Sequence, residues 1–196
     1  MANKFISEPD PVPTDRTFEN PFSVALDISN DGYKIFKDKA FLDVSAKLAM
    51  HLLDTYFVKE QGIFTEYSTL DGRPFLNENN DYIVDPGHSI EFCSFALEFA
   101  RLSEKAEVYK SLRERIRAIA PALLLWNVES GWNKKHLGFY KGIEALSGKP
   151  VNPTMPWWPL PEALLALALG YEATGDEVFL GKYVEVHNAY FGSYMN

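Results

Sequence analysis

The feature that most constrains the fold of this chain is a repeated unit in which a glycine-containing loop leads to an apolar helix and then to an amphipathic one. The first loop contains GIFTEYSTLDGRP and the second contains LGFYKGIEALSGKP. Each loop is followed, after a spacer, by a proline-started segment that ends in a glutamate, PGHSIE and then WPLPE. A helix pair of this size buries its apolar face only against neighbouring units, so the repeat predicts a circular or solenoidal array.

Helical spacing of apolar residues extends along most of the chain, and we expect an all-α fold of about three helix pairs with the more apolar helix of each pair inside. Turn residues and β-formers interrupt it in two loops that are expected to hold short extended, hairpin-like pieces. Besides the short apolar segment NPFSVALDIS, helices are predicted over 37–58, from Gly87 onward, and over 104–126, 156–175 and 176–195, with the loops at 60–75 and 129–153.

The repeat also sets the domain boundaries. Residues 1–19 are rich in proline and aspartate and are predicted to be an irregular N-terminal segment, while 20–196 form one partial toroid. Asp176 directly follows Gly175, so it is a candidate N-cap for the last helix.

Composition and charge exclude several classes of function. The chain is 46% hydrophobic and 14% aromatic, which is typical of a folded globular protein. Its formal net charge is −8 and no stretch concentrates Lys and Arg, so nucleic-acid binding is not expected. The sequence lacks an apolar signal-peptide core and the ~18 consecutive apolar residues of a membrane span. We therefore expect a soluble, cytoplasmic protein with no membrane partner.

Metal and cofactor signatures are missing from the sequence. Cys93 is the single cysteine and lies in an apolar run, so it is expected to be buried and inert in a reducing compartment. No Cys/His cluster has metal-ligand spacing and no glycine-rich phosphate loop is present. Neither a metal nor a cofactor is expected.

The candidate site lies at the start of the apolar helices, because loops that precede the inner helices of such an array gather on one face. His88 and Glu91 stand one helical turn apart at the beginning of the first of these helices. Read without context, His88 caps the helix, Glu91 complements its dipole, and the aromatic pair belongs to the core. The residues expected on the site face are His88, Glu91, Trp157, Trp158 and Glu162, with Glu66 on the first loop as a weaker candidate.

The segments PGHSIEF, GFY and PWWPLPEALLALALGYEATGD resemble the N-acylglucosamine 2-epimerase and cellobiose 2-epimerase superfamily, which also holds mannose-type aldose–ketose isomerases. That family commonly shows Pro-Gly-His-x-x-Glu-Trp and Trp-Trp-Pro-Gln-x-Glu-Ala. The resemblance runs from about Asn20 to about Tyr190. It implies an (α/α)6 toroid with a sugar site in its central well, of which this chain holds about half. The family's His-x-Pro-Arg segment, with a second catalytic histidine, does not occur in this sequence.

The resemblance implies proton transfer at C2 of an open-chain aldose or N-acylhexosamine, giving a 2-epimerase or an isomerase. His88 would be the catalytic base, since an imidazole exchanges protons near neutral pH. Substrate contacts would come from five residues, Glu91, Trp157, Trp158, Glu162 and Glu66.

Two other classes of function stay open. A glycoside hydrolase or lyase on the same toroid would need two carboxylates roughly 5–10 Å apart, which Glu91 and Glu162 could supply, with Asp85 as a third. A non-catalytic fragment or carbohydrate-binding relative is the other possibility. Whatever the function, a half-toroid would expose the apolar flanks of its terminal helix pairs, so self-association or pairing with another chain is expected.

Overall fold

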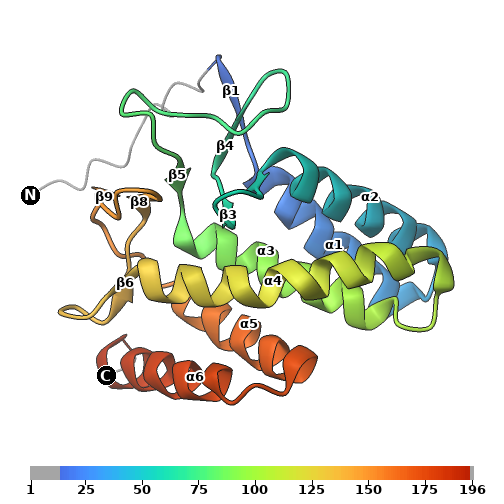
Figure 1. Ribbon diagram of the computed structural model, residues 1–196. Helices are drawn as coiled ribbons and strands as arrows, with labels where there is room; N and C mark the ends of the chain where they lie inside the picture. The colour runs from blue at the N-terminus through green and yellow to red at the C-terminus, as the bar shows by residue number, and fades with distance from the viewer. Residues whose placement is uncertain (1–13, 195–196) are drawn as a thin grey trace, which may run out of the picture.

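The computed structural model describes residues 14–194, and most of them lie in helices (Figure 1). The all-α prediction is therefore confirmed. The α-helices of this region are α1 (Asn20–Phe36), α2 (Lys39–Thr55), α3 (Pro86–Leu102), α4 (Lys110–Ser130), α5 (Pro159–Thr174) and α6 (Val178–Ala189), with a 3₁₀ turn at Glu107–Tyr109 and a π turn at Tyr190–Tyr194.

The helices form two layers. In the first layer α3 lies between α1 and α5 and packs against both. In the second layer α2, α4 and α6 each pack against the helix that precedes them. The core between the layers contains closely stacked rings such as Phe64 and Phe92, whose centroids are 4.3 Å apart. This arrangement agrees with the predicted helix pairs and with the inner position of α3 and α5.

Short strands occupy the loops at the end where α3 begins (Figure 1). All of their pairings are antiparallel, and the pair that matters most for the site is β5–β8, which joins the first loop to the second through Ile83↔Glu144 and Val84↔Ile143. The strands are β1 (Arg16–Phe18), β2 (Phe57–Val58), β3 (Ile63–Phe64), β4 (Tyr67–Thr69), β5 (Ile83–Val84), β6 (Trp132–Asn133), β7 (Gly138–Phe139), β8 (Gly142–Glu144) and β9 (Pro150–Asn152). The sheets are β1–β4, β2–β3, β6–β7 and β5–β8–β9.

Local sequence explains where the inner helices start and stop. Pro86 opens α3 and Pro159 opens α5, positions where a missing N–H is harmless. Gly175 ends α5 with a left-handed φ of 71°, a conformation that glycine adopts without strain. The predicted cap of the last helix is wrong by one residue: the N-cap of α6 is Glu177, whose side chain makes no capping hydrogen bond, while the Asp176 carboxylate accepts a hydrogen bond from the Val178 N–H at 3.0 Å.

Several sequence-based expectations need correction. The helix expected over 104–126 is α4, which runs from Lys110 to Ser130. NPFSVALDIS is not a short segment, because it belongs to the full helix α1 that continues to Phe36. The second inner helix begins at Pro159 rather than at 156. Within the segment predicted to be irregular, Arg16–Phe18 forms β1, because its backbone finds a partner in β4. The rest of that prediction, for 1–13, lies outside the described residues.

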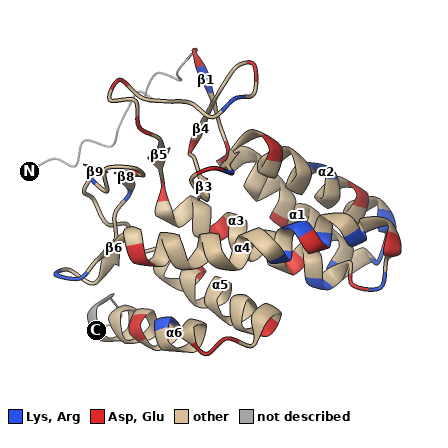
Figure 2. Cartoon of the chain, viewed as in Figure 1, with Lys and Arg blue, Asp and Glu red and all other residues tan. Residues whose placement is uncertain are grey.

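Two expectations drawn from composition agree with the structure. Cys93 is fully buried, and burial raises the pKa of its thiol, which makes it unreactive. Basic residues are scattered over the helices and loops and alternate with acidic ones (Figure 2). Among residues 14–194, no helix is long and apolar enough to cross a membrane.

Candidate functional site

His88 stands in the first turn of α3, and its position is fixed by the residue that caps this helix. The Asp85 carboxylate accepts hydrogen bonds from the backbone N–H groups of Gly87, at 2.9 Å, and His88, at 3.4 Å. The helix cap is thus Asp85, and the interpretation of His88 as a simple cap is wrong. The imidazole is left free to point across the end of the helix.

The Nδ1 side of the ring faces three carboxylates. Nδ1 lies 3.0 Å from Oε2 of Glu66, 3.3 Å from Oδ2 of Asp85 and 3.5 Å from Oε1 of Glu19. Because an ionised carboxylate only accepts hydrogen bonds, the Nδ1–H donates to Glu66 and the ring is held in one orientation.

The Nε2 side of the ring faces the second loop and the start of α5. Nε2 lies 3.4 Å from Nζ of Lys141, which also forms an ion pair with Asp85. The indole of Trp158 stacks on the imidazole with centroids 5.3 Å apart and planes 26° apart. We call His88, Glu19, Glu66, Asp85 and Lys141 the histidine cluster.

Electrostatics within the histidine cluster favour a protonated imidazole. Burial lowers the pKa of His88, but the hydrogen bond that its Nδ1–H donates to Glu66 and the charges of Glu66, Asp85 and Glu19 outweigh burial and raise this pKa to about 9. Burial also raises the pKa of Glu66, against the opposing effect of His88.

Glu19 is the most deeply buried carboxyl group of the cluster. Its residue is 0% exposed, Ser23 Oγ donates to its Oε2, and its Oε1 makes no hydrogen bond. Burial, reinforced by the nearby charge of Glu66, raises the pKa of Glu19 to about 8. When Glu19 is neutral, the carboxylates of Glu66 and Asp85 balance the positive charges of His88 and Lys141, so the cluster carries little net charge.

The structure brings three of the predicted site residues into contact: His88, Glu66 and Trp158. Glu91 lies one turn further along α3 and, within residues 14–194, makes no hydrogen bond to the ring, so it does not orient the imidazole. Burial raises the pKa of Glu91 to about 7, the His88 charge opposes this shift, and the Glu162 charge adds to it.

Glu162 and Trp157 lie further from the imidazole. The Glu162 carboxyl is partly buried at the start of α5, and burial, with the charge of Asp27, raises its pKa. Trp157 is 61% exposed, and the ring that stacks on His88 is that of its neighbour Trp158. Neither residue belongs to the histidine cluster.

Sequence reasoning missed Glu19 and Lys141 as site residues and gave Asp85 only a reserve role. Glu19 directly precedes the Asn20-Pro21 start of α1, and Lys141 interrupts the glycine-aromatic stretch of the second loop. The signal available for Asp85 was its place just before a helix-starting proline.

Metal-binding geometry is present at one point of the cluster. Ligand atoms of Glu19, Glu66 and His88 lie within 4.8 Å of one another, close enough to hold a cation. The Nδ1 proton and the Lys141 ammonium already supply positive charge there, so the chemistry of these donors suits a buried acid–base group better than a metal.

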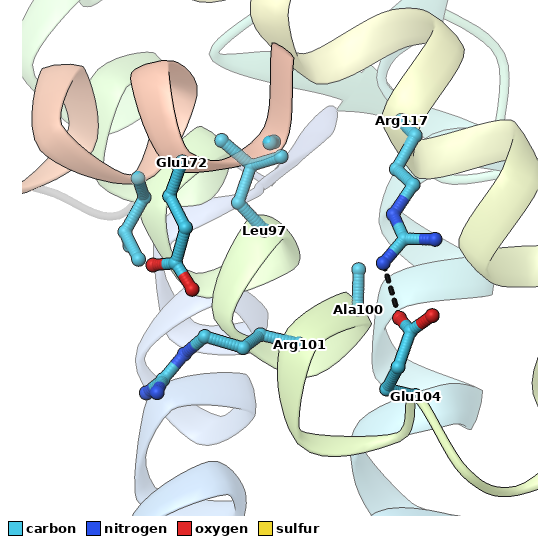
Figure 3. A pocket seen from close by; sticks show the side chains of 8 residues that line it. Leu97, Ala100, Arg101, Glu104, Arg117 and Glu172 are labelled. Carbon is cyan, nitrogen blue, oxygen red and sulfur yellow. Dashed lines mark hydrogen bonds and ion pairs between the residues drawn. The ribbon is translucent and has the colours of Figure 1, made fainter. Parts of the chain in front are cut away.

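A separate cavity of about 230 Å³ lies at the opposite ends of α3 and α5 (Figure 3). Arg117 and Glu104 form an ion pair across one side of it. None of the cluster residues lines this cavity, so it is not part of the candidate site. Its lining residues are Leu97, Ala100, Arg101, Glu104, Arg117, Leu169, Glu172 and Ala173.

Comparison with known proteins identifies relatives of the chain. Residues 31–196 match the family described as N-acylglucosamine 2-epimerase (GlcNAc 2-epimerase). The N-acylglucosamine 2-epimerase of Rattus norvegicus is 30% identical over 105 residues, which cover 52% of this chain and 23% of the rat protein. D-mannose isomerase superposes with a TM-score of 0.72 at 18% identity, covering 92% of this chain and 46% of that structure. A sugar epimerase from a ruminal bacterium superposes with a TM-score of 0.73 at 14% identity, and the match covers 91% of this chain and 42% of that structure.

The structural matches show a shared fold, that of the (α/α)6 toroids, of which this chain forms a part. The chain spans less than half the length of these relatives. The match to the family covers most of the chain, including both inner-helix motifs and His88. The chain therefore belongs to the N-acylglucosamine 2-epimerase family.

Proposed function

We propose that this chain supplies the catalytic base of a sugar 2-epimerase or aldose–ketose isomerase. The observation that carries the proposal is the state of His88: its Nδ1 is held by Glu66 while its Nε2 is turned away from the carboxylates. A positioned imidazole of this kind can give and take a proton at one fixed point.

The first step is opening of the sugar ring. With a pKa of about 9, His88 is protonated at neutral pH and gives its Nε2 proton to the ring oxygen. Glu91, with a pKa near 7, takes the proton of the C1 hydroxyl. The ring C1–O bond breaks, a C1 carbonyl forms, and His88 is left as a neutral base.

The second step is removal of the C2 proton, which lies next to the new carbonyl and is acidic. Neutral His88 takes this proton and an enediolate forms. If His88 returns the proton to C1 and the O2 proton passes to O1, the product is the ketose; the epimer forms only if a second acid–base group protonates C2 from the other face.

Aromatic and acidic residues around His88 would bind the sugar. One face of Trp158 is occupied by the imidazole, so its role is to hold the base. The exposed ring of Trp157 offers surface on which a pyranose can stack. Glu162 and Glu66 would accept hydrogen bonds from sugar hydroxyls, Glu66 while also holding Nδ1.

The test is proton NMR of mannose, glucose and N-acetylmannosamine with the purified protein in D2O. Loss of the C2–H signal together with a new sugar supports the proposal. Hydrolysis of a glycoside without C2–H exchange would instead support a hydrolase, and binding with neither reaction would support a non-catalytic carbohydrate-binding protein.

Two further properties accompany this proposal: a cytoplasmic location and self-association. Exposed apolar side chains occur on both flanks of the array, at Val24 and Ile28 of α1 and at Leu180 and Val184 of α6. Such surface favours association with a second copy. Sedimentation should detect a species larger than the monomer, and a monodisperse monomer would contradict this expectation.

A further inference from the structure

Lys141 reaches the candidate site from the second loop, far from His88 in sequence. Its backbone N–H donates to the carbonyl of Thr154 at 2.8 Å, which fixes the chain just before β8. The antiparallel pairing of β8 with β5 then places Lys141 opposite the segment that leads into α3. The position of its side chain is thus set by backbone structure on both sides.

The ammonium group of Lys141 has three partners at this place. Nζ is paired with Oδ2 of Asp85, lies 3.4 Å from Nε2 of His88, and stands 5.5 Å from the ring centroid of Trp158. Its side chain is 34% exposed and, together with Glu66 and Asp85 of the cluster, lines a cavity of about 130 Å³. The ammonium is therefore anchored and still accessible to a small molecule.

We infer that Lys141 is a second catalytic residue, whose ammonium binds the oxygen that becomes negative when His88 removes the C2 proton. This inference rests on the proposed function and assigns a group to a task that the histidine cannot perform. A base that takes a proton from carbon needs a positive group beside the oxygen on which charge develops.

The proton and electron balance of the step is simple. The C2–H bond breaks and its proton passes to Nε2. The electron pair forms the C1=C2 double bond, and the π electrons of the C1 carbonyl move to O1. The Lys141 ammonium donates a hydrogen bond to O1 and keeps its own proton. When the imidazolium returns its proton to carbon, the electron pairs move back in the opposite direction. No oxidant or reductant is needed.

The position of Lys141 suits this role. C2 and the carbonyl oxygen are separated by two bonds, so the base and the oxyanion donor must stand within a few ångströms of each other. The distance of 3.4 Å between Nε2 and Nζ meets this requirement. Because Asp85 holds the ammonium before substrate arrives, little reorganisation is needed during the reaction.

A purely structural role is the competing explanation, in which Lys141 only neutralises buried Asp85. The two roles differ in kinetics, so we would measure C2–H exchange in D2O for the wild type, Lys141→Met and Lys141→Arg. Lys135→Met, an exposed lysine on the same loop, is the matched control.

The inference predicts that Lys141→Met lowers the maximal exchange rate by roughly 10²–10³-fold, the effect of removing one oxyanion donor, with little change in KM. Lys141→Arg keeps a positive charge and should recover part of this loss, while Lys135→Met should match the wild type. An unchanged maximal rate in Lys141→Met, or a change in KM alone, would overturn the inference and leave the proposed function standing.

Two other outcomes are also decisive. If wild-type protein exchanges no C2–H of any sugar, the proposed function fails and the catalytic role of Lys141 fails with it. If Lys141→Met does not fold, Lys141→Arg decides, because it retains the ion pair with Asp85. A structural lysine then predicts the wild-type rate, whereas an oxyanion donor at a defined distance predicts a lower one.

Discussion

The two loop-and-helix units of this chain share one architecture and differ in their chemistry. Each begins with a two-stranded hairpin, β2–β3 or β6–β7, and ends in an inner helix that opens with proline. The first unit places a carboxylate cap and then His88 at the start of α3. The second unit has no side-chain cap at the start of α5 and offers Trp158 in its place.

The difference shows that the repeat determines where a side chain can stand, while single residues determine what it does there. The first unit alone would leave Nε2 of His88 uncovered. The second unit adds Lys141, which the β5–β8 pairing brings to the imidazole, and Trp158, which the packing of α5 against α3 brings there. The site is therefore a property of the contact between the units.

The largest predicted difference between the two units appears when one histidine is replaced in each. His88→Gln should lower C2–H exchange by roughly 10²–10⁴-fold, the usual contribution of a general acid–base group. His136→Gln, in the exposed turn of the second unit, should leave exchange unchanged. Equal rates for the two variants in the D2O assay would mean that His88 is not the base.

A glutamate from each loop gives the next comparison. Glu66→Gln removes the carboxylate that holds Nδ1, and it should lower the pKa of His88 by about 1–3 units. Glu144 accepts hydrogen bonds from Asn77, Asn79 and Ser147 instead, so Glu144→Gln should not alter His88. NMR titration of histidine-labelled protein measures both effects, and a similar shift in the two variants would contradict the assignment of Glu66.

The contact between the units can be broken sterically at Gly87. A Cβ there would lie 2.5 Å from the Trp158 ring and 2.9 Å from Pro159, so Gly87→Ala should destabilise the fold by about 1–3 kcal/mol. Gly181 on α6 has no atom within 4 Å of a built Cβ, and Gly181→Ala should stabilise by about 0.5–1 kcal/mol. Urea unfolding measures the stability of both variants. If Gly87→Ala were as stable as the wild type, the contact between Gly87 and Trp158 would be looser than the structure indicates.

The last prediction concerns a pH dependence of stability. Glu19 and His88 both have raised pKa values in the folded chain, about 8 and about 9, so the folded state keeps protons that the unfolded state has lost. The free energy of unfolding should therefore fall as pH rises from about 4.5 to 9.

Glu19→Gln should make this decline shallower below pH 8, and the exposed Glu60→Gln should not. The measurement is the urea midpoint at a series of pH values. A midpoint that rises with pH over this range, or an identical slope in Glu19→Gln, would contradict the burial of a protonated Glu19.

Much of the fold could be predicted from the sequence because helical periodicity and proline-started helices are local signals. The helix pairs, the inner position of α3 and α5 and the extended pieces in the loops all follow from them. The full length of α1 was missed because NPFSVALDIS is followed by a polar stretch. The pairing of Arg16–Phe18 with β4 depends on a distant strand that no local pattern reveals.

The candidate site was predictable in part for the same reason. His88 and Glu66 stand in recognisable local contexts, on a helix start and on its preceding loop. Lys141 and Glu19 reach the imidazole only through tertiary structure: one through the short β5–β8 pairing and the other through the packing of α1 beside α3. The pKa of His88 is raised mainly by Glu66 and Asp85, and no periodic pattern in the sequence reveals these contacts.

The most direct test of the account is the pKa of the His88 imidazole, measured by NMR titration of the wild-type protein with the histidine signals assigned. We expect a pKa near 9, with the proton on Nδ1 retained after Nε2 titrates. A value at or below about 6.5, the ordinary value for histidine, would contradict it, because the carboxylates of the first unit would then not act on the ring.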